Sequence, residues 1–371
     1  MIDNKAYIFG GVTAENLLAS NDVHAVTVEH SGKSGEMDYG LVPALPLPDG
    51  GEVPVCRTNH AACAFHGNIF VYGGSNEKDE LIDEKSSLWL FSPERKAWDL
   101  LQPSKSGSSP GARRNAKMFE YNGSIVLYGG FDATGDAASD LWKFDVASKT
   151  WHQLPTAPVA TTNAALANGQ LYLVSAKDAV SGQLHYLGIS LPIGEMAWES
   201  FEFPANPLTP GPRARHDGAF LPLTTGWGRN YLVYLLGARD DSYSKTTVLS
   251  SKSVKEVDDI TQFSDTWALQ IPSSDLEAKP AWSIKKMIKP AKIKDAIRHA
   301  VGAATGHLAW AEAVVQLPSD KNLEGDEGKL HPGPRAFFGA DVMENGHSLV
   351  FWGGLDARGG RIGDGWIVKF S

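Results

Sequence analysis

The 371-residue sequence contains only two cysteines, Cys56 and Cys63, and this scarcity excludes a disulfide framework and a cysteine-rich zinc site. No apolar run approaches the roughly 18 residues that a membrane-spanning helix needs. The amino terminus also lacks the charged and apolar segments of a signal peptide. Positive charge is in deficit, since 34 Lys and Arg against 43 Asp and Glu give a formal net charge of −9. We therefore expect a cytoplasmic protein that binds neither nucleic acid nor membrane surfaces.

What the sequence does contain is a repeated unit rich in glycine and aromatic residues. The clearest copy spans residues 108–155, with Asn122-Gly123 between two β-rich runs and a Gly129-Gly130 doublet after the second run. Asp140-Leu141-Trp142 opens a third run, and Trp151 lies in a fourth. An Asn-Gly pair between such runs predicts a hairpin. Four short strands form one sheet that cannot bury both faces alone, so the copies must stack around an axis as propeller blades do.

The doublet, the Asp-x-Trp and the later Trp resemble the kelch repeat, and the resemblance covers nearly the whole chain. It implies an all-β protein, a six-bladed kelch-type β-propeller in a single domain over residues 1–371. The six blades are expected at about residues 1–50, 51–105, 106–155, 156–205, 206–320 and 321–371. Apolar residues at helical spacing, separated by Lys and Arg, predict a helical insertion in blade five at about residues 284–304.

Each end of the chain lacks one strand of the repeat. In the first unit, residues 2–5 occupy the place of the turn between strands one and two, and the sixth unit ends after its third strand. Strand four of one blade and strand one of the next are consecutive in such a chain. We therefore expect the two ends to lie in adjacent, incomplete blades, with residues before Met1 supplying the missing strands. The alternative is a ring closed by three-stranded blades.

A Pro-x-x-Arg motif recurs where each blade begins. Its copies are Pro54/Arg57, Pro110/Arg113, Pro210/Arg213 and Pro332/Arg335. Four arginines on one face are able to form an anion clamp, because the guanidinium fork matches a carboxylate. The other interpretation is that each arginine braces a loop through backbone carbonyls. Because the arginines repeat in several blades, we favour the structural role.

Positions that differ among the copies are free to form a site, and the sequence holds two such sets. Two residues after the arginines stand Asn59, Asn115, Thr161, Arg215 and Phe337, and directly after the doublets stand Val12, Ser75, Phe131, Lys177, Arg239 and Leu355. The kelch resemblance implies that both sets lie at the mouth of the central channel. Apolar side chains mixed with the cations Arg215, Lys177 and Arg239 predict a cup for a small organic molecule that is anionic or carbonyl-bearing. The alternative is an ordinary solvated mouth.

Two of these residues are candidates for chemistry. Arg215 is expected to stabilise developing negative charge, and His216, beside Asp217, is the candidate general base. His60 stands at what the alignment of repeats gives as the position matching His216. By strand alternation both histidines are expected to point into the packing between blades, and adjacent residues 216 and 217 to face opposite ways.

Plant nitrile-specifier proteins are stand-alone kelch propellers that this chain resembles in size. Their iron-binding Glu-x-x-x-Asp-x-x-x-His follows a doublet, and here Arg239 stands where the Glu is needed and no His follows in the loop. We therefore expect no metal and no cofactor. The predicted function is that of a metal-independent cyclase, isomerase or lyase acting in the mouth. An interaction scaffold for protein partners and a metal-dependent lyase of the nitrile-specifier type are the alternatives.

Overall fold

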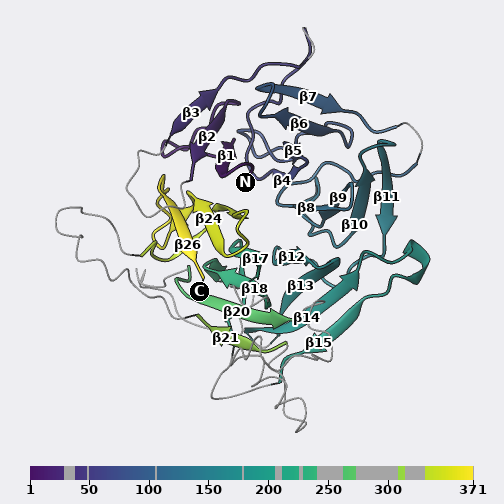
Figure 1. Ribbon diagram of the computed structural model, residues 1–371, viewed down its shortest axis with the longest axis vertical. Helices are drawn as coiled ribbons and strands as arrows, with labels where there is room; N and C mark the ends of the chain where they lie inside the picture. Colours follow the sequence, from purple (N-terminus) through teal and green to yellow (C-terminus); the bar gives the residue numbers. More distant parts are fainter. Residues whose placement is uncertain are drawn as a thin grey trace, which may run out of the picture.

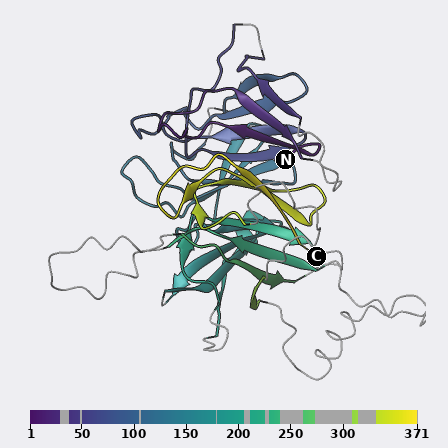
Figure 2. The same cartoon turned by 90° about the vertical axis from the view of Figure 1, so that its left-hand side faces the viewer.

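Six small antiparallel sheets are arranged as blades around a central channel (Figure 1). The computed structural model describes residues 1–28, 38–47, 50–104, 107–177, 179–204, 211–224, 229–239, 262–272, 308–313 and 331–370. Figure 2 shows the same ring from the side, with the yellow strands of the last blade between the purple first blades and the green fifth blade. The predicted all-β, six-bladed propeller is confirmed. The predicted helix at residues 284–304 lies outside the described residues.

Four blades carry four strands in consecutive order from the channel outwards. Blade two has β4 (Ala61–Phe65), β5 (Asn68–Tyr72), β6 (Leu88–Ser92) and β7 (Ala97–Leu101). Blade three has β8 (Lys117–Tyr121), β9 (Ser124–Tyr128), β10 (Leu141–Asp145) and β11 (Thr150–Leu154). Blade four has β12 (Ala164–Ala167), β13 (Gln170–Lys177), β14 (Val180–Gly188) and β15 (Glu199–Glu202), with the 3₁₀ turn η1 (Ile193–Glu195) before β15. Blade five has β17 (Ala219–Thr224), β18 (Asn230–Leu235), β20 (Thr266–Ile271) and β21 (Trp310–Glu312).

The first and last blades have three strands each. Blade one has β1 (Lys5–Phe9), β2 (Val23–Thr27) and β3 (Tyr39–Val42), and blade six has β23 (Gly339–Val342), β24 (Ser348–Trp352) and β26 (Gly365–Lys369). Two short ladders join β16 (Arg215–His216) to β19 (Ala238–Arg239), and β22 (Arg335–Ala336) to β25 (Leu355–Asp356). The two ends of the chain therefore lie in adjacent, three-stranded blades, as the repeats predict. No helix among the described residues is long and apolar enough to cross a membrane.

The turn between strands one and two shows why the first blade begins as it does. In blades three and four this turn is Asn-Gly with both residues at positive φ, for example 46° at Asn122 and 78° at Gly123. Such a turn matches the twist of paired strands. In blade one Asp3 and Asn4 adopt φ of 48° and 57° and form the same turn. Ile2, which bridges Lys5, thus occupies the last position of strand one.

The core lies between blades rather than at one centre. Five apolar clusters fill the contacts of blades one with two, two with three, three with four, four with five, and five with six. Tryptophans of the outer strands take part, as where the rings of Tyr72 in blade two and Trp151 in blade three lie 5.9 Å apart. Among the described residues no such cluster joins blade six to blade one.

The glycine doublets are the points where neighbouring blades touch through their backbones. Gly73 has φ of +63°, and a Cβ placed on it would overlap the carbonyl oxygen of Arg113 in the next blade. The following amide, of Gly74, donates a hydrogen bond of 2.9 Å to the same oxygen. Gly11 and Arg57 repeat this bond between blades one and two at 2.8 Å. Glycine is thus required at the doublet for two reasons, the left-handed backbone conformation and the close approach of the neighbouring blade.

Candidate functional site at the channel mouth

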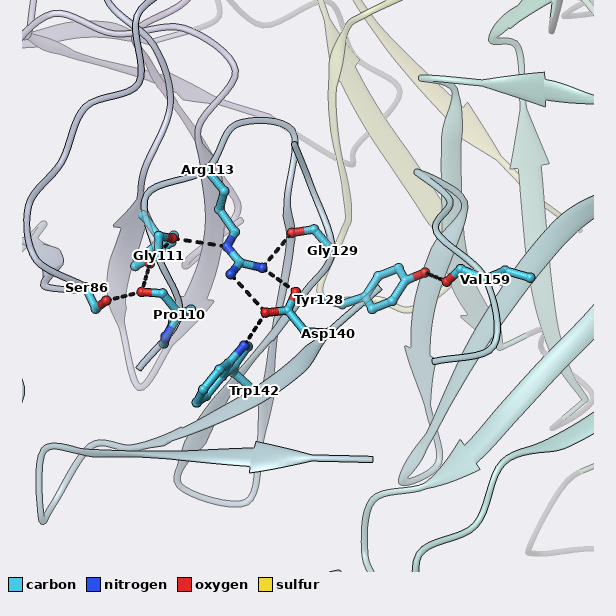
Figure 3. A network of polar contacts seen from close by, with 10 residues as sticks. Ser86, Pro110, Gly111, Arg113, Tyr128, Gly129, Asp140, Trp142 and Val159 are labelled. Atoms are coloured by element: carbon cyan, nitrogen blue, oxygen red, sulfur yellow. Dashed lines mark hydrogen bonds and ion pairs between the residues drawn. The ribbon is translucent and has the colours of Figure 1, made fainter. Parts of the chain in front are cut away.

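The repeated arginines are internal braces. Arg113 is buried, and its Nη atoms donate to both carboxylate oxygens of Asp140 at 2.7 and 3.0 Å (Figure 3). Its Nη1 also donates to the carbonyl of Gly129 at 3.0 Å, and its Nε to that of Gly111 at 3.2 Å. Burial alone would raise the pKa of Asp140, yet hydrogen bonds and charge from Arg113 hold that pKa below its usual value. This arginine ties the start of the blade to the doublet and offers nothing to a ligand.

The same brace occurs in three other blades. Arg57 pairs with Glu84 and with the carbonyl of Gly73, and Arg335 pairs with Asp364 and with the carbonyl of Gly353. Both arginine side chains are fully buried. These arginines therefore brace loops by donating to backbone carbonyls. Each also binds a carboxylate, a partner that was not predicted from the sequence.

In blade five the brace is Arg215 and not Arg213. Arg215 is 3% exposed and donates to both oxygens of Asp265 at 2.6 and 2.9 Å and to the carbonyl of Leu236 at 3.0 Å. Arg213 is exposed. The local sequence contains the motif twice, because Pro212/Arg215 has the same spacing as Pro210/Arg213. The prediction that Arg215 lacks a counterpart and faces the mouth as a catalytic cation is therefore wrong.

The corrected register changes which residues are equivalent. His60 follows its brace arginine by three residues and His216 by one, so the two histidines are not matched. The two positions directly after the brace are the ones that vary at the mouth. They hold Thr58-Asn59, Arg114-Asn115, His216-Asp217 and Ala336-Phe337, and in blade four, where Ala160 stands in place of the brace arginine, Thr161-Thr162.

His60 belongs to the packing between blades, in agreement with the structural role expected of it. Its ring meets that of Phe9 edge-on at 5.2 Å. Burial, reinforced by the charge of Arg57, lowers the pKa of His60 to about 3. The ring also lines the central cavity, and with so low a pKa it is neutral in the folded protein near pH 7.

This burial predicts an acid-sensitive contribution to stability. Below about pH 6.5 the unfolded chain takes up a proton on this imidazole, whereas the folded protein does so only near pH 3. Unfolding therefore becomes easier as pH falls through that window, by about 1.4 kcal/mol per pH unit at the steepest. Urea melts at several pH values should show a flatter dependence for His60→Gln than for the parent. A His60 NMR resonance that titrates near pH 6.5 in the folded protein would contradict the assignment.

His216, in contrast, is partly exposed and has a carboxylate beside it; Asp217 lines the central cavity, whereas His216 is outside its described lining. Its Nδ1 lies 2.8 Å from Oδ2 of Asp217, and its side chain is 40% exposed. Asp217 has φ of 49°, and this left-handed turn brings two adjacent side chains together. The expectation that residues 216 and 217 face opposite ways, based on strand alternation, is therefore wrong. In a neutral ring whose Nδ1–H is held by a carboxylate, Nε2 is the basic nitrogen.

The mouth opens into a central cavity of about 2050 Å³. Six of the residues expected in the cup line it, namely Val12, Asn59, Asn115, Phe131, Phe337 and Leu355. Phe337 offers an aromatic surface to a ligand, since its side chain is 47% exposed.

The other expected cup residues lie elsewhere. Ser75 is fully buried, and Thr161 donates its hydroxyl hydrogen to the carbonyl of Val174 at 2.9 Å. Lys177 pairs with Glu202 of the outer strand β15. Arg239 pairs with Arg215 through the backbone in the β16–β19 ladder. The three cations predicted for the cup are thus absent from the described cavity lining.

Two other arginines line the cavity, and both stand at positions that differ among the repeats, so the sequence carried a signal for them. Arg114, directly after a brace arginine, lines the cavity and pairs with Asp79. Arg361 also lines it and donates from Nε to the side-chain oxygen of Asn16 at 2.9 Å. Residue 361 closes its loop by a bridge to residue 355, as 18, 81 and 137 do in their blades. Those three positions hold Leu18, Leu81 and Ala137, so the charge at 361 is particular to one blade.

Backbone and side-chain contacts together join these residues into one arc. Ala336 pairs with Leu355, which places Phe337 next to that strand, and Leu355 bridges Arg361. On one side Arg361 reaches Asn16 of blade one. On the other, the ring of Phe337 lies 5.9 Å from that of His216. The arc therefore places a cation, an aromatic face and Asp217 in the cavity lining, with His216 in contact with Phe337 and Asp217 just outside that lining.

A lysine lies deeper in the same cavity. Lys117 is half-buried at the start of β8, where burial lowers its pKa and the charge of Asp217 opposes that effect. In the part of the chain that the structure describes, no group of three or more His, Cys, Asp and Glu side chains is placed to hold a metal ion. The loop that continues from Arg239 towards residue 261 lies outside the described residues.

Comparison with known proteins adds three findings. The family model KLHDC2/KLHL20/DRC7 Kelch-repeats domain matches residues 1–223. The chain is 29% identical over 159 residues to Rho GTPase-activating protein gacHH of Dictyostelium discoideum, covering 42% of this chain and 9% of that protein. It is 26% identical over 154 residues to Kelch domain-containing protein 3 of Homo sapiens, covering 40% and 37% respectively. The matched segments thus span well under half of these relatives.

A solved structure shares the overall architecture. The structure of YjhT superimposes with a TM-score of 0.59 over 100% of this chain and 93% of the other, at 13% sequence identity. At that identity the likeness concerns the fold alone.

Proposed function

The chain belongs to the kelch-repeat family, whose propeller fold supports a binding or scaffold role, and from this premise we propose that it binds a small organic acid at the channel mouth. The observation that carries the proposal is the arc formed by Arg361, Phe337 and His216. A guanidinium is suited to a carboxylate, and an aromatic face to the apolar part of the same molecule.

Arg361 is the cation best suited to the ligand. Its hydrogen bond to Asn16 uses Nε alone, and the two Nη groups are the fork that grips a carboxylate. The brace arginines, by comparison, have their forks occupied by partly buried carboxylates. Phe337 and Leu355 supply the apolar contact beside it.

The finer proposal is proton transfer without metal or cofactor, of the isomerase, cyclase or lyase type. Asp217 holds Nδ1–H of His216, so Nε2 is able to take a proton from a carbon next to a carbonyl and return it at another atom. Lys117 and Arg114, which line the cavity as Asp217 does, add positive charge that favours the enolate form.

The test uses phenylpyruvate, which combines a carboxylate, an aromatic ring and an enolisable carbonyl. We expect saturable acceleration of its keto–enol conversion, followed by ultraviolet absorbance. Arg361→Ala should raise KM on the order of ten- to a hundredfold, the effect of losing one charge-assisted hydrogen-bonded contact. His216→Gln should lower kcat and leave KM nearly unchanged.

A matched control is available on the same loop. Arg358 is exposed, and its backbone amide donates a hydrogen bond to the carboxylate of Asp356. Arg358→Ala therefore removes the same charge as Arg361→Ala, but outside the cavity lining. Equal losses in Arg361→Ala and Arg358→Ala would show that general charge, and not the arc, holds the ligand. No saturation by phenylpyruvate and no organic acid retained in the purified protein by mass spectrometry would reject the proposal.

A protein-interaction scaffold is the second candidate, and exposed apolar side chains on the same rim favour it. Leu17 is 62% exposed and lines the mouth together with Phe337. The matched segment is 9% of Rho GTPase-activating protein gacHH, a much longer protein in which the kelch-like segment is a small part. A partner held at this rim would be lost with Leu17→Asp, whereas turnover of a small acid would persist.

A further inference from the structure

Among the five inner strands that the structure describes in blades two to six, only that of blade three begins with a charged side chain. The position follows the brace arginine by four residues, at Ala61, Lys117, Ala219 and Gly339 in blades two, three, five and six. Blade four has Ala164 at the matching place, the first residue of β12. All five residues line the central cavity. Four small residues and one lysine thus stand around the channel at one level.

The pairing of the strands supports this equivalence. Lys117 pairs with Tyr128 and Ala61 pairs with Tyr72, and both partners directly precede a glycine doublet. The position also faces open space, because a Cβ placed on Gly339 would meet no heavy atom within 4 Å. The propeller therefore forms with alanine or glycine at this position, and its fold gives no reason for a lysine there.

The surroundings of Lys117 favour a reactive amine. The side chain is half-buried, and among the described residues no hydrogen bond or ion pair holds its Nζ. Burial lowers the pKa of Lys117, and the charge of Asp217 opposes that effect. Glu120, which also lines the cavity, stands three residues further along β8, about 10 Å away. A desolvated lysine without a fixed partner offers more neutral amine, which is the nucleophilic form.

Asp217 acts on both this amine and the candidate base. The carboxylate lines the cavity, and its Oδ2 lies 2.8 Å from Nδ1 of His216. Its backbone amide donates to the hydroxyl of Thr162 in blade four at 3.1 Å, which fixes the turn. The same carboxylate is the charge that acts on Lys117. A nucleophilic amine and a base beside it are the two groups that imine chemistry at a carbonyl needs.

We propose that Lys117 forms a Schiff base with the carbonyl group of a small oxo acid bound in the central cavity. The inference rests on the proposed function for the class of ligand and adds a covalent step to it. The electron pair of the neutral Nζ forms a bond to the carbonyl carbon, and the carbonyl oxygen takes up a proton. The nitrogen then loses a proton, and the new hydroxyl group is protonated and leaves as water. Overall an ammonium and a carbonyl give an iminium and water, so the step needs no oxidant or reductant.

The iminium would make the proton transfer at the neighbouring carbon easier. It keeps the positive charge of Lys117 but places it on the nitrogen bonded to the former carbonyl carbon, where it draws electrons from the adjacent C–H bond. The proton passes to Nε2 of His216 and leaves an enamine. Return of a proton to carbon, followed by addition of one water, releases the oxo acid and restores the lysine.

The experiment traps the iminium by reduction. The full chain is incubated with phenylpyruvate and sodium cyanoborohydride, which reduces an iminium to a stable secondary amine, and the modified residue is located by peptide mass mapping. Lys78 serves as an internal reference, because it is exposed and lines the same cavity. We expect modification of Lys117 to exceed that of Lys78 at least about tenfold, since a bound carbonyl is held beside one amine and meets the other only by diffusion.

Two substitutions at residue 117 separate covalent chemistry from charge. Lys117→Arg keeps the positive charge but forms no imine, and Lys117→Ala installs the residue that blades two, four and five carry, so it should fold with an unchanged thermal melt. Both should abolish the adduct. Both should also slow exchange of deuterium from heavy water into the carbon beside the carbonyl on the order of a hundredfold, an effect typical of one lost catalytic group. Lys78→Arg should change neither measurement.

Three outcomes would overturn the inference. These are no adduct on Lys117, equal modification of Lys117 and Lys78, and parental deuterium exchange in Lys117→Arg, which would show that charge alone suffices. The two proposals also fail separately. Saturable keto–enol conversion with no adduct would reject the Schiff base and keep the proposed function, whereas an adduct on Lys117 without that conversion would reject the proposed function alone.

Discussion

Arg57→Ala is expected to lower the free energy of unfolding by roughly 3–5 kcal/mol, the cost of removing one partner of a buried ion pair. The guanidinium of Arg57 is fully buried and donates to Glu84 and to the carbonyls of Val55 and Gly73. Without it, two carbonyls lose this donor and the partly buried carboxylate of Glu84 keeps only the indole N–H of Trp89 as a side-chain donor. The loss would be measured by urea denaturation followed by tryptophan fluorescence.

Two further variants serve as controls. Arg95→Ala removes an arginine that is exposed in the same blade and should change stability by less than about 0.5 kcal/mol. Arg57→Lys keeps the charge but loses the fork, so an intermediate loss is expected. If Arg57→Ala and Arg95→Ala were equally stable, the brace would contribute nothing beyond surface charge.

Gly73→Ala is expected to have an effect of similar size by a different physical route. The backbone at Gly73 is left-handed, which costs an alanine about 1–2 kcal/mol. The new methyl group would also overlap the carbonyl of Arg113, which belongs to the backbone of the next blade and cannot rotate aside. We expect a total loss above about 3 kcal/mol, the range reserved for strain and overpacking at special positions.

Gly67→Ala separates the two contributions. Gly67 has φ of +72°, close to that of Gly73, but no heavy atom lies within 4 Å of its added Cβ. It should therefore lose only the conformational cost of about 1–2 kcal/mol. The same loss of stability in both variants would mean that the neighbouring blade moves aside to accept the methyl group at residue 73. The close approach of the two backbones would then not be a reason why glycine is needed there.

The fold was predictable because the signals repeat in phase. Turns such as Asn122-Gly123, doublets and outer-strand tryptophans recur at blade spacing, and each demands a local geometry that only a meander satisfies. The incomplete first and last blades followed from the same alignment. The carboxylate partner of each brace was harder to find, because Glu84 precedes β6 by a different spacing from that of Asp140 before β10.

The site was predicted less well, for two physical reasons. The segment around Arg213 and Arg215 contains the motif in two registers, and only burial decides between them. Lys177 was misplaced because β13 continues past the expected doublet and a bulge interrupts its pairing between Ser175 and Lys177. One extra residue in a strand turns the following side chains to the other face. Phe131, Phe337 and Leu355 were placed at the mouth because their blades keep the regular spacing.

The uneven contacts around the ring also bear on how the protein comes apart. A closed ring with six equal seams would have to break two of them to release any blade, but in the described chain five seams are apolar and the sixth is a few polar contacts. The molecule is thus energetically a linear array bent into a circle, and such arrays open from their ends. Blades one and six are the terminal units, so slow amide exchange should be concentrated in blades three and four and decline towards β1–β3 and β23–β26.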